Sequence, residues 1–180
     1  MIQVSKIDAD LLPSFDVVWA MKPTERGQVC TAKGSTSAHR WYKSYGAVPP
    51  RSADSLSYMF SDGNITAFDP IPDIFKPLLR EADNQIVVNW YVDENDYCPY
   101  HRDCLDHMSD GASVAIINLV PLGEPLRELV FCPGAGERYE RFACHHGSCI
   151  TFSGDALTKW RHGVPKAKGR RISISLRQYN

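Results

Sequence analysis

Five short stretches in the second half of the chain are rich in Val, Ile, Phe or Tyr, and turn-forming residues separate them. Such stretches predict β-strands, and several short strands in succession are typical of a sandwich or a jelly-roll barrel. The last stretch alternates strictly between polar and aliphatic side chains, so its two faces differ in character. We expect strands at residues 85–92, 113–120, 128–132, 148–152 and 171–179.

The first 60 residues show no such pattern and are predicted to be irregular, because glycines and the Pro49–Pro50 pair interrupt their aromatic positions. One short helix is predicted over residues 73–82, where Ile74, Leu78 and Leu79 are the apolar positions. The expected fold class is therefore α+β, with β-structure dominant.

Length and composition fit one domain. The 180 residues suffice for a single core, and the hydrophobic (43%) and charged (23%) fractions exclude a disordered chain. With 20 Lys and Arg against 21 Asp and Glu, the net charge of −1 excludes a uniformly basic nucleic-acid coat protein. No run approaches the ~18 apolar residues of a membrane helix, and Met1 to Asp8 lack a signal-peptide pattern. We expect an intracellular monomer, cytoplasmic or nuclear, without membrane contacts.

Charge is unevenly distributed along the chain. Residues 22–51 and 159–177 are rich in Lys and Arg, whereas residues 81–110 hold eight acidic residues and a single Arg. This pattern fits a cation-binding pocket rimmed by an anion-binding surface, and it equally fits solvated faces of opposite sign.

His101 and Asp103 lie two positions apart, so on an extended segment both side chains share one face. With His162 they supply two imidazoles and one carboxylate, the facial ligand set of non-haem Fe(II) oxygenases, which leaves the other positions of the ion open for substrate and oxygen. By itself the pattern is weak, because so short a motif is common by chance.

The six cysteines allow a different metal site. Zinc is one interpretation of the cluster Cys98, His101 and Cys104, and of the Cys and His residues within 144–149. Neither cluster has the paired spacing of common zinc sites, so ordinary reduced thiols are the simpler alternative.

Polar residues on two predicted strands suggest an anion site. Two guanidiniums and two hydroxyls on one face of the last strand suit a small dicarboxylate, because Arg binds carboxylates bidentately. An edge strand with its polar face in water is the alternative. An amide and a phenol on the strand at 85–92 also share a face and can bind the same anion. The residues are Arg171, Ser173, Ser175 and Arg177 on the last strand, and Asn89 and Tyr91 on the other.

In this order and spacing, the motifs resemble those of the AlkB-like Fe(II)- and 2-oxoglutarate-dependent dioxygenases. The resemblance spans about residues 40–179 and is strongest from Asn89 onward. It implies a double-stranded β-helix (jelly-roll) barrel at about 85–180, preceded at about 1–84 by a helix and a substrate-recognition lid, in one domain over 1–180. The matched motifs are Asn89-x-Tyr91, His101-x-Asp103, His146-Gly147-Ser148, Ser153-Gly154, Trp160-x-His162-x-Val164-Pro165 and Arg171-x-Ser173-x-Ser175-x-Arg177.

Residue by residue, the resemblance makes His101, Asp103 and His162 the Fe(II) ligands. Five residues would hold the cosubstrate 2-oxoglutarate, with O2 as the second cosubstrate. Of these, Arg171 and Tyr91 are expected at the far carboxylate, and Arg177 and Asn89 at the end that chelates iron. Ser173 completes the set.

Two departures from the family pattern bear on function. Ser173 and Ser175 stand where the family usually has Asn and Thr, a change that keeps hydrogen bonding. A second acidic residue often follows the metal Asp by two positions and touches the base. Here that position is Leu105 and the nearest acid is Asp106, which bears on base recognition rather than cofactor use.

The resemblance implies oxidative demethylation of N-methylated nucleobases in DNA or RNA, with formaldehyde release, on a single-stranded or flipped base. Basic and aromatic residues at 39–45 could stack on the base and meet phosphates. A hydroxylase or demethylase of a protein side chain or small molecule is one alternative, and a catalytically silent binding domain is another. The predicted substrate contacts are Arg40, Trp41, Tyr45 and Asp106.

Overall fold

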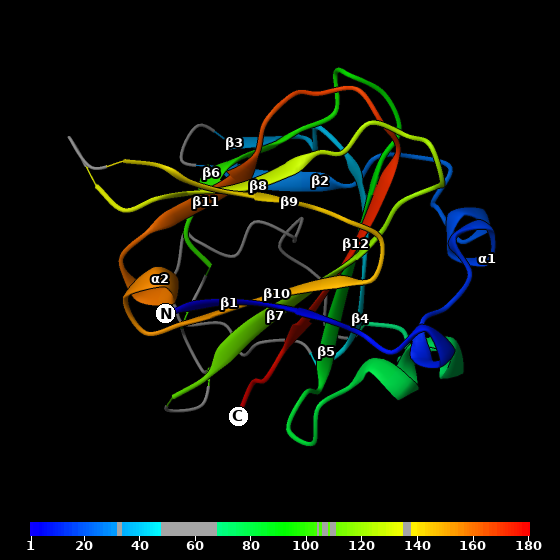
Figure 1. Cartoon of the computed structure of the whole chain (residues 1–180), viewed down its shortest axis with the longest axis horizontal. Helices are drawn as coiled ribbons and strands as arrows, with labels where there is room; N and C mark the ends of the chain where they lie inside the picture. The colour runs from blue at the N-terminus through cyan, green and yellow to red at the C-terminus, as the bar shows by residue number, and fades with distance from the viewer. Residues whose placement is uncertain (32–33, 48–67, 104, 106–107, 109–110, 135–137) are drawn as a thin grey trace.

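Two antiparallel sheets face each other across a buried interior (Figure 1). The computed structural model describes residues 1–31, 34–47, 68–103, 105, 108, 111–134 and 138–180. Its elements are β1 (Ile2–Lys6), η1 (Ala9–Leu11), α1 (Phe15–Ala20), β2 (Gln28–Thr31), β3 (Gly34–Ser37), β4 (Trp41–Gly46), η2 (Asp73–Leu78), β5 (Gln85–Tyr91), β6 (Cys98–His101), β7 (Ser113–Leu119), β8 (Glu128–Cys132), β9 (Glu140–Ala143), β10 (Ser148–Ser153), α2 (Asp155–Thr158), β11 (Arg161–Val164) and β12 (Arg171–Arg177).

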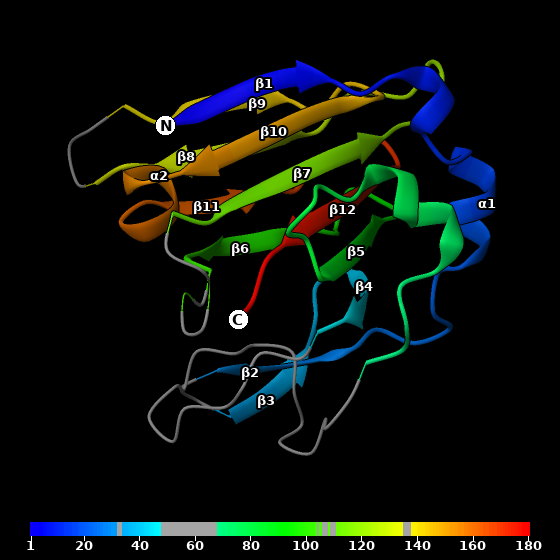
Figure 2. The same cartoon turned by 90° about the horizontal axis from the view of Figure 1, so that it is seen from below.

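The larger sheet has the strand order β1-β10-β7-β12-β5-β4 in the described part of the chain, and the smaller has the order β6-β11-β8-β9. Strands β2 and β3 form a separate hairpin, which lies beside β4 in Figure 2. Strands that follow one another in the chain lie mostly in different positions or sheets, as in a jelly roll. The β-dominated α+β prediction is confirmed.

The strict alternation of polar and aliphatic side chains explains why β12 can lie at the centre of the larger sheet. Its odd-numbered residues point between the sheets, while Ile172, Ile174 and Leu176 point to the other side. There they join a core that includes Val18 of α1 and Phe75 of η2. Because β12 pairs with both β5 and β7, the alternative of an exposed edge strand is wrong.

A second core fills the space between the sheets at the end away from β4. Phe131 of β8, Phe152 of β10 and Leu157 of α2 are part of it. Aromatic contacts tie its members together, with the rings of Phe131 and Phe152 5.1 Å apart and nearly perpendicular. This core forms one wall of the pocket described below.

The described residues before β5 form more strands than predicted. Strands β1 and β4 are part of the larger sheet, so the prediction of an irregular first 60 residues is wrong for residues 1–31 and 34–47, the ones that the structure describes. The sheet also extends beyond residues 85–180. The helix expected over residues 73–82 is a shorter 3-10 helix, η2, because Pro77 cannot donate a helical hydrogen bond. The five predicted strands match β5, β7, β8, β10 and β12, with ends differing by at most two residues.

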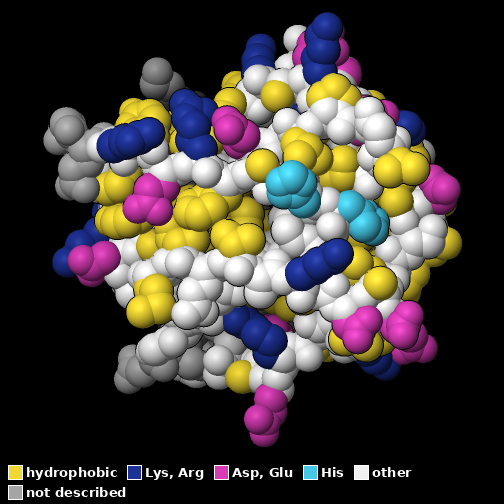
Figure 3. Space-filling model, viewed as in Figure 1, with side chains coloured by type: hydrophobic (Ala, Val, Ile, Leu, Met, Phe, Trp, Pro, Cys, Tyr) yellow, Lys and Arg dark blue, Asp and Glu magenta, His cyan; other side chains and the backbone are white. Residues whose placement is uncertain are grey.

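Two observations bear on the binding partners and membrane contacts considered above. On the face shown in Figure 3, acidic and basic side chains are interspersed around the rim. Among the described residues, no helix has the length and apolar character needed to cross a membrane.

Candidate metal and anion site

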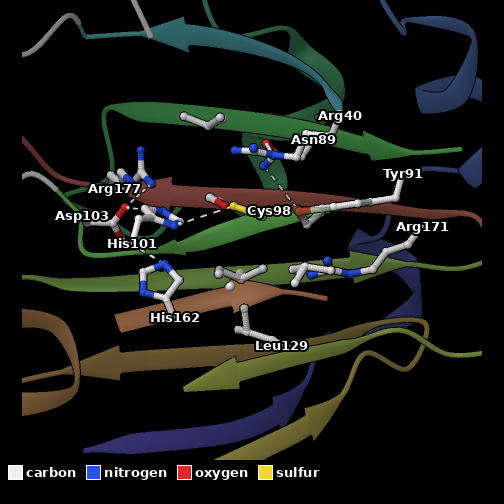
Figure 4. A pocket seen from close by; sticks show the side chains of 16 residues that line it. Arg40, Asn89, Tyr91, Cys98, His101, Asp103, Leu129, His162, Arg171 and Arg177 are labelled. Carbon is white, nitrogen blue, oxygen red and sulfur yellow. Dashed lines mark hydrogen bonds and ion pairs between the residues drawn. The ribbon is translucent and has the colours of Figure 1, made fainter. Parts of the chain in front are cut away.

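Three side chains predicted to bind metal converge at one end of the pocket between the sheets (Figure 4). His101 ends β6 and His162 is the second residue of β11, and these two positions are direct partners in the antiparallel pairing of the strands. Asp103 follows His101 by two residues, as the sequence requires. The candidate ligand atoms all lie within 4.8 Å of one another.

These distances suit one ion. His101 Nε2 lies 3.8 Å from Asp103 Oδ1, and His162 Nε2 lies 3.9 Å from Asp103 Oδ2. A transition-metal ion bonds such donors at about 2.1 Å, so two donors up to about 4.2 Å apart can share it. Asp103 Oδ2 is buried and forms no hydrogen bond with any described residue, which leaves it available as a ligand.

Contacts on the Nδ1 side of the ring fix the orientation of His101. Its Nδ1 lies 2.9 Å from the Pro99 carbonyl oxygen and 3.7 Å from Cys98 Sγ. Donation from Nδ1–H to the carbonyl turns Nε2 toward Asp103, so that Nε2 can bind a metal ion once it gives up its proton, the arrangement usual for metal-binding histidines. Burial acts to lower the pKa of His101, but Cys98, Asp103 and the Pro99 carbonyl outweigh it and raise the pKa to about 9.

His162 is in the opposite situation. Only 5% of the residue is exposed, and its ring packs 4.9 Å from that of Phe152 and 5.6 Å from that of Phe131. Burial, reinforced by His101, lowers the pKa of His162 to about 3. Its imidazole is therefore neutral at physiological pH, as a metal ligand must be.

Arg177 connects the triad to β12, the strand predicted to bind an anion. Its Nη2 donates to Asp103 Oδ1 at 2.7 Å, and both residues are buried. Burial acts to raise the pKa of Asp103, but Arg177 and the two histidines outweigh it and lower the pKa. The carboxylate is thus ionised and held in place.

Arg171 lies at the other end of the pocket, 1% exposed. Its Nε and Nη2 both donate to Asn118 Oδ1, at 2.9 and 2.7 Å, and its guanidinium carbon lies 5.1 Å from the centre of the Tyr91 ring. The third nitrogen, Nη1, is buried without a hydrogen bond to any described residue. A buried, unpaired N–H of a cation is costly unless a ligand accepts from it.

The expected partners of the two arginines line the same pocket. Burial, with Cys98 adding to it, raises the pKa of Tyr91 to about 12, so its phenol stays protonated and can donate a hydrogen bond. Asn89 Nδ2 donates to Ser173 Oγ at 3.3 Å. Ser175 also lines the pocket, whose volume is about 450 Å³ including its open mouth.

The residues predicted to contact the substrate lie in different environments. Tyr45 is 4% exposed and packs in the core with its ring 6.0 Å from that of Phe75, so it cannot stack on a base, and that prediction is wrong. Trp41 is half-buried, with Lys22 Nζ 4.5 Å and the Arg26 guanidinium carbon 4.2 Å from its ring centre. Asp106 lies outside the described residues.

Arg40 is in a different environment from the one predicted. It is 4% exposed and lines the pocket with the triad, rather than the outer surface where phosphates would pass. Its Nε donates to Asn89 Oδ1 at 2.7 Å.

Sequence reasoning missed Asn118, which holds Arg171. The available signal was a polar residue on the inward face of an otherwise apolar strand, β7.

The alternative of a zinc site finds no support. Within the described ranges, only the two histidines and Asp103 form a potential metal cluster. The described cysteines Cys98, Cys132, Cys144 and Cys149 are free thiols. Cys104 lies outside the described residues.

Comparison with known proteins supports the fold. A scan of protein-family models finds no match, and a search of curated proteins finds none either. Among solved structures, the chain is similar to an oxidoreductase of the 2OG-Fe(II) oxygenase family from Burkholderia pseudomallei. The TM-score is 0.59 at 14% sequence identity, and the match covers 98% of this chain and 84% of the other. At this identity the likeness shows a common fold, which confirms the predicted jelly roll.

Proposed function

We propose that this chain is an Fe(II)- and 2-oxoglutarate-dependent dioxygenase. The observation that carries the proposal is a single pocket with a His-Asp-His triad at one end and a buried arginine with an unpaired nitrogen at the other. A ligand set of this kind suits Fe(II) with open positions, and Arg171 suits the carboxylate of a keto diacid. The fold shared with a 2OG-Fe(II) oxygenase family protein agrees with this assignment.

His101, Asp103 and His162 would hold the iron. When bound, Fe(II) together with 2-oxoglutarate and O2 supplies the oxidation of a substrate C–H bond, with 2-oxoglutarate converted to succinate and CO2. The protein contributes position and environment. Arg171 and Tyr91 would bind the far carboxylate of 2-oxoglutarate, and Arg177 and Asn89 the end beside the metal.

The walls of the pocket keep water away from the reacting groups. Leu129 of β8, Ile116 of β7 and Val164 of β11 line it with apolar surface, and each is at most 6% exposed. Exclusion of water strengthens the ion pair between Arg177 and Asp103 and limits side reactions. No acid or base beyond the metal ligands is needed for this role.

For the substrate, the first candidate is an N-methylated nucleobase, which would be demethylated with release of formaldehyde. Its support is the AlkB-like order of the motifs and the half-buried Trp41, beside which Lys22 is a candidate phosphate contact. The second candidate is a protein side chain or a small molecule. It is favoured by the burial of Arg40 and Tyr45, two of the residues expected to contact nucleic acid.

The cofactor assignment is tested first by spectroscopy and turnover. Under anaerobic conditions, Fe(II) and 2-oxoglutarate should give the weak visible charge-transfer band of a chelated keto acid, and O2 should then produce succinate. His101→Ala should lose both signals because the ion loses a ligand, whereas His145→Ala, an exposed histidine outside the pocket, should retain both. A wild-type protein without the band would overturn the proposal.

The substrate class is tested by formaldehyde release. Methylated single-stranded oligonucleotides and methylated peptides are incubated separately with the loaded enzyme. Release from oligonucleotides alone supports the first candidate, and release from peptides alone supports the second. Succinate formation without formaldehyde from either would direct the search to hydroxylation or to small molecules.

A further inference from the structure

Arg40 is a third guanidinium in the pocket. It directly precedes β4, which lies at one edge of the larger sheet, whereas Arg171 and Arg177 both belong to β12 in the middle of that sheet. In Figure 4 its side chain reaches toward Asn89 from the side of β4 and β5. Arg40 therefore enters the pocket from the segment that connects β3 to β4, whereas Arg171 and Arg177 enter it from the middle of the larger sheet.

The positive charge of Arg40 is not balanced by an ion pair with any carboxylate in the described part of the chain. Among the described residues, none of the ion pairs involves Arg40, and its one hydrogen bond uses Nε, which donates to Asn89 Oδ1 at 2.7 Å. The two terminal nitrogens make no hydrogen bond with that part of the chain. A cation that is 96% buried in this way is costly to the fold unless a ligand carries the opposite charge.

The cosubstrate does not account for this third cation. The two carboxylates of 2-oxoglutarate are matched by Arg171 at one end and Arg177 at the other. Asp103 is the acidic residue lining the pocket. With a divalent ion and the cosubstrate bound, the pocket still carries an excess of positive charge. An anionic second ligand would compensate for it.

We propose that Arg40 binds an anionic group, a carboxylate or a terminal phosphate, of a small-molecule substrate oxidised in this pocket. The proposal rests on the proposed cofactor assignment. The depth of Arg40 selects a small molecule, because a phosphodiester inside a polymer cannot reach a buried guanidinium without bringing its flanking nucleotides into the pocket. Arg40 is thus a specificity-determining residue, separate from the groups that hold iron and 2-oxoglutarate.

The test measures binding without turnover. Protein saturated with Mn(II) and 2-oxoglutarate is titrated calorimetrically with three- to six-carbon carboxylic acids and with their primary amides, and in a second arm with 1-methyladenosine 5′-monophosphate and 1-methyladenosine. In the wild type, at least one anion should bind about tenfold or more tightly than its neutral counterpart, as expected of a charge-assisted pair. The two arms separate a carboxylate from a phosphate.

Variants assign the preference to Arg40. Arg40→Gln should bring the anion-to-neutral ratio to within about twofold, and Arg40→Lys should retain part of it because the charge remains. Arg141→Gln removes an equivalent charge from an exposed ion pair with Glu128, outside the pocket, and should leave the ratio unchanged. The ratio compares two ligands on the same protein, so a general loss of stability does not alter it.

Three results would overturn the inference. They are no anion preference in the wild type, a preference that persists in Arg40→Gln, and a loss of 2-oxoglutarate affinity in Arg40→Gln as large as in Arg171→Gln, which would assign Arg40 to the cosubstrate. Equal binding of methylated oligonucleotides by wild type and Arg40→Gln, without small-anion binding, would favour the nucleic-acid candidate. If 2-oxoglutarate itself fails to bind with the metal, the proposed function falls as well.

Discussion

His101 and His162 are the same kind of side chain in opposite electrostatic settings. His101 lies beside Cys98 and the Pro99 carbonyl, and its pKa is raised to about 9, whereas packing against Phe131 and Phe152 accompanies a pKa of about 3 for His162. At neutral pH one imidazole carries a proton and the other does not. The proposed metal ion would therefore displace a single proton, from His101.

This proton predicts a pH dependence of metal binding. Because the pKa of His101 is raised, the proton is bound below pH 9 and competes with the ion, so apparent Mn(II) affinity should rise about tenfold per pH unit between pH 6.5 and 8.5. Calorimetric titrations at three pH values measure the slope. Cys98→Ala removes the thiol that raises this pKa and should flatten the upper part of the profile. An affinity independent of pH in the wild type would contradict the argument.

At the scale of elements, β11 and β6 must approach closely for the triad to form. A Cβ atom on Gly163 would lie 2.8 Å from the Cys98 carbonyl oxygen and 3.0 Å from the Tyr100 ring. The backbone of β6 thus occupies the space that a side chain would need. Glycine at this position allows His162 to lie opposite His101 in the register of the two strands.

Gly163→Ala should therefore separate the strands and move His162 away from the other ligands. We expect Mn(II) affinity to fall by about 10- to 100-fold, the range seen when ligand orientation is lost. Calorimetry measures this loss, and circular dichroism should show the β-structure retained. Arg161→Ala, an exposed neighbour on the same strand, should bind Mn(II) like the wild type. Unchanged affinity in Gly163→Ala would mean that the register does not depend on this contact.

The elements also show what sequence patterns can and cannot predict. Strand β12 was predictable because both faces are constrained, one by the core and one by the pocket. Strand β1 was not, because its five residues are largely exposed and its partner β10 lies far away in sequence. Strands β6 and β11 contain Pro99 and Gly163, which weaken any strand signal.

Local sequence patterns predicted the candidate site only in part, for the same reason. His101 and Asp103 were linked by their spacing alone, whereas His162 joins them only through the pairing of β11 with β6. No local pattern contains that pairing, so the grouping of His162 with the other two was a weak hypothesis until the family resemblance supported it. Arg40 was identified as an anion-binding residue but placed in the wrong environment, since burial at a sheet edge depends on tertiary structure.

At the scale of the whole molecule, Arg127 ties the two sheets together. It is 1% exposed, and its guanidinium donates to the Gly169 carbonyl oxygen at 2.7 Å, to that of Asp96 at 2.9 Å, and to that of Asp93. These carbonyls belong to the β5–β6 and β11–β12 loops, which each cross between the sheets. The guanidinium carbon also lies 5.2 Å from the centre of the Tyr91 ring.

Arg127→Ala should destabilise the protein by about 3 kcal/mol or more, because three backbone carbonyls in two loops lose a charged donor that is itself buried. Denaturant unfolding of the ligand-free protein measures the change. Arg170→Ala removes a partly exposed ion pair with Glu124 and should cost less than about 1 kcal/mol. Equal effects of the two substitutions would show that Arg127 does not hold the sheets together.

The central place of β12 has a consequence for biosynthesis. Its neighbours β5 and β7 leave the ribosome earlier, yet neither can complete its hydrogen bonding until residues 171–177 enter between them. A nascent chain lacking this segment exposes two open strand edges, which are prone to intermolecular pairing. Because the inserted segment also carries Arg171 and Arg177, the two guanidiniums of the proposed 2-oxoglutarate site reach the pocket only when this strand has been inserted.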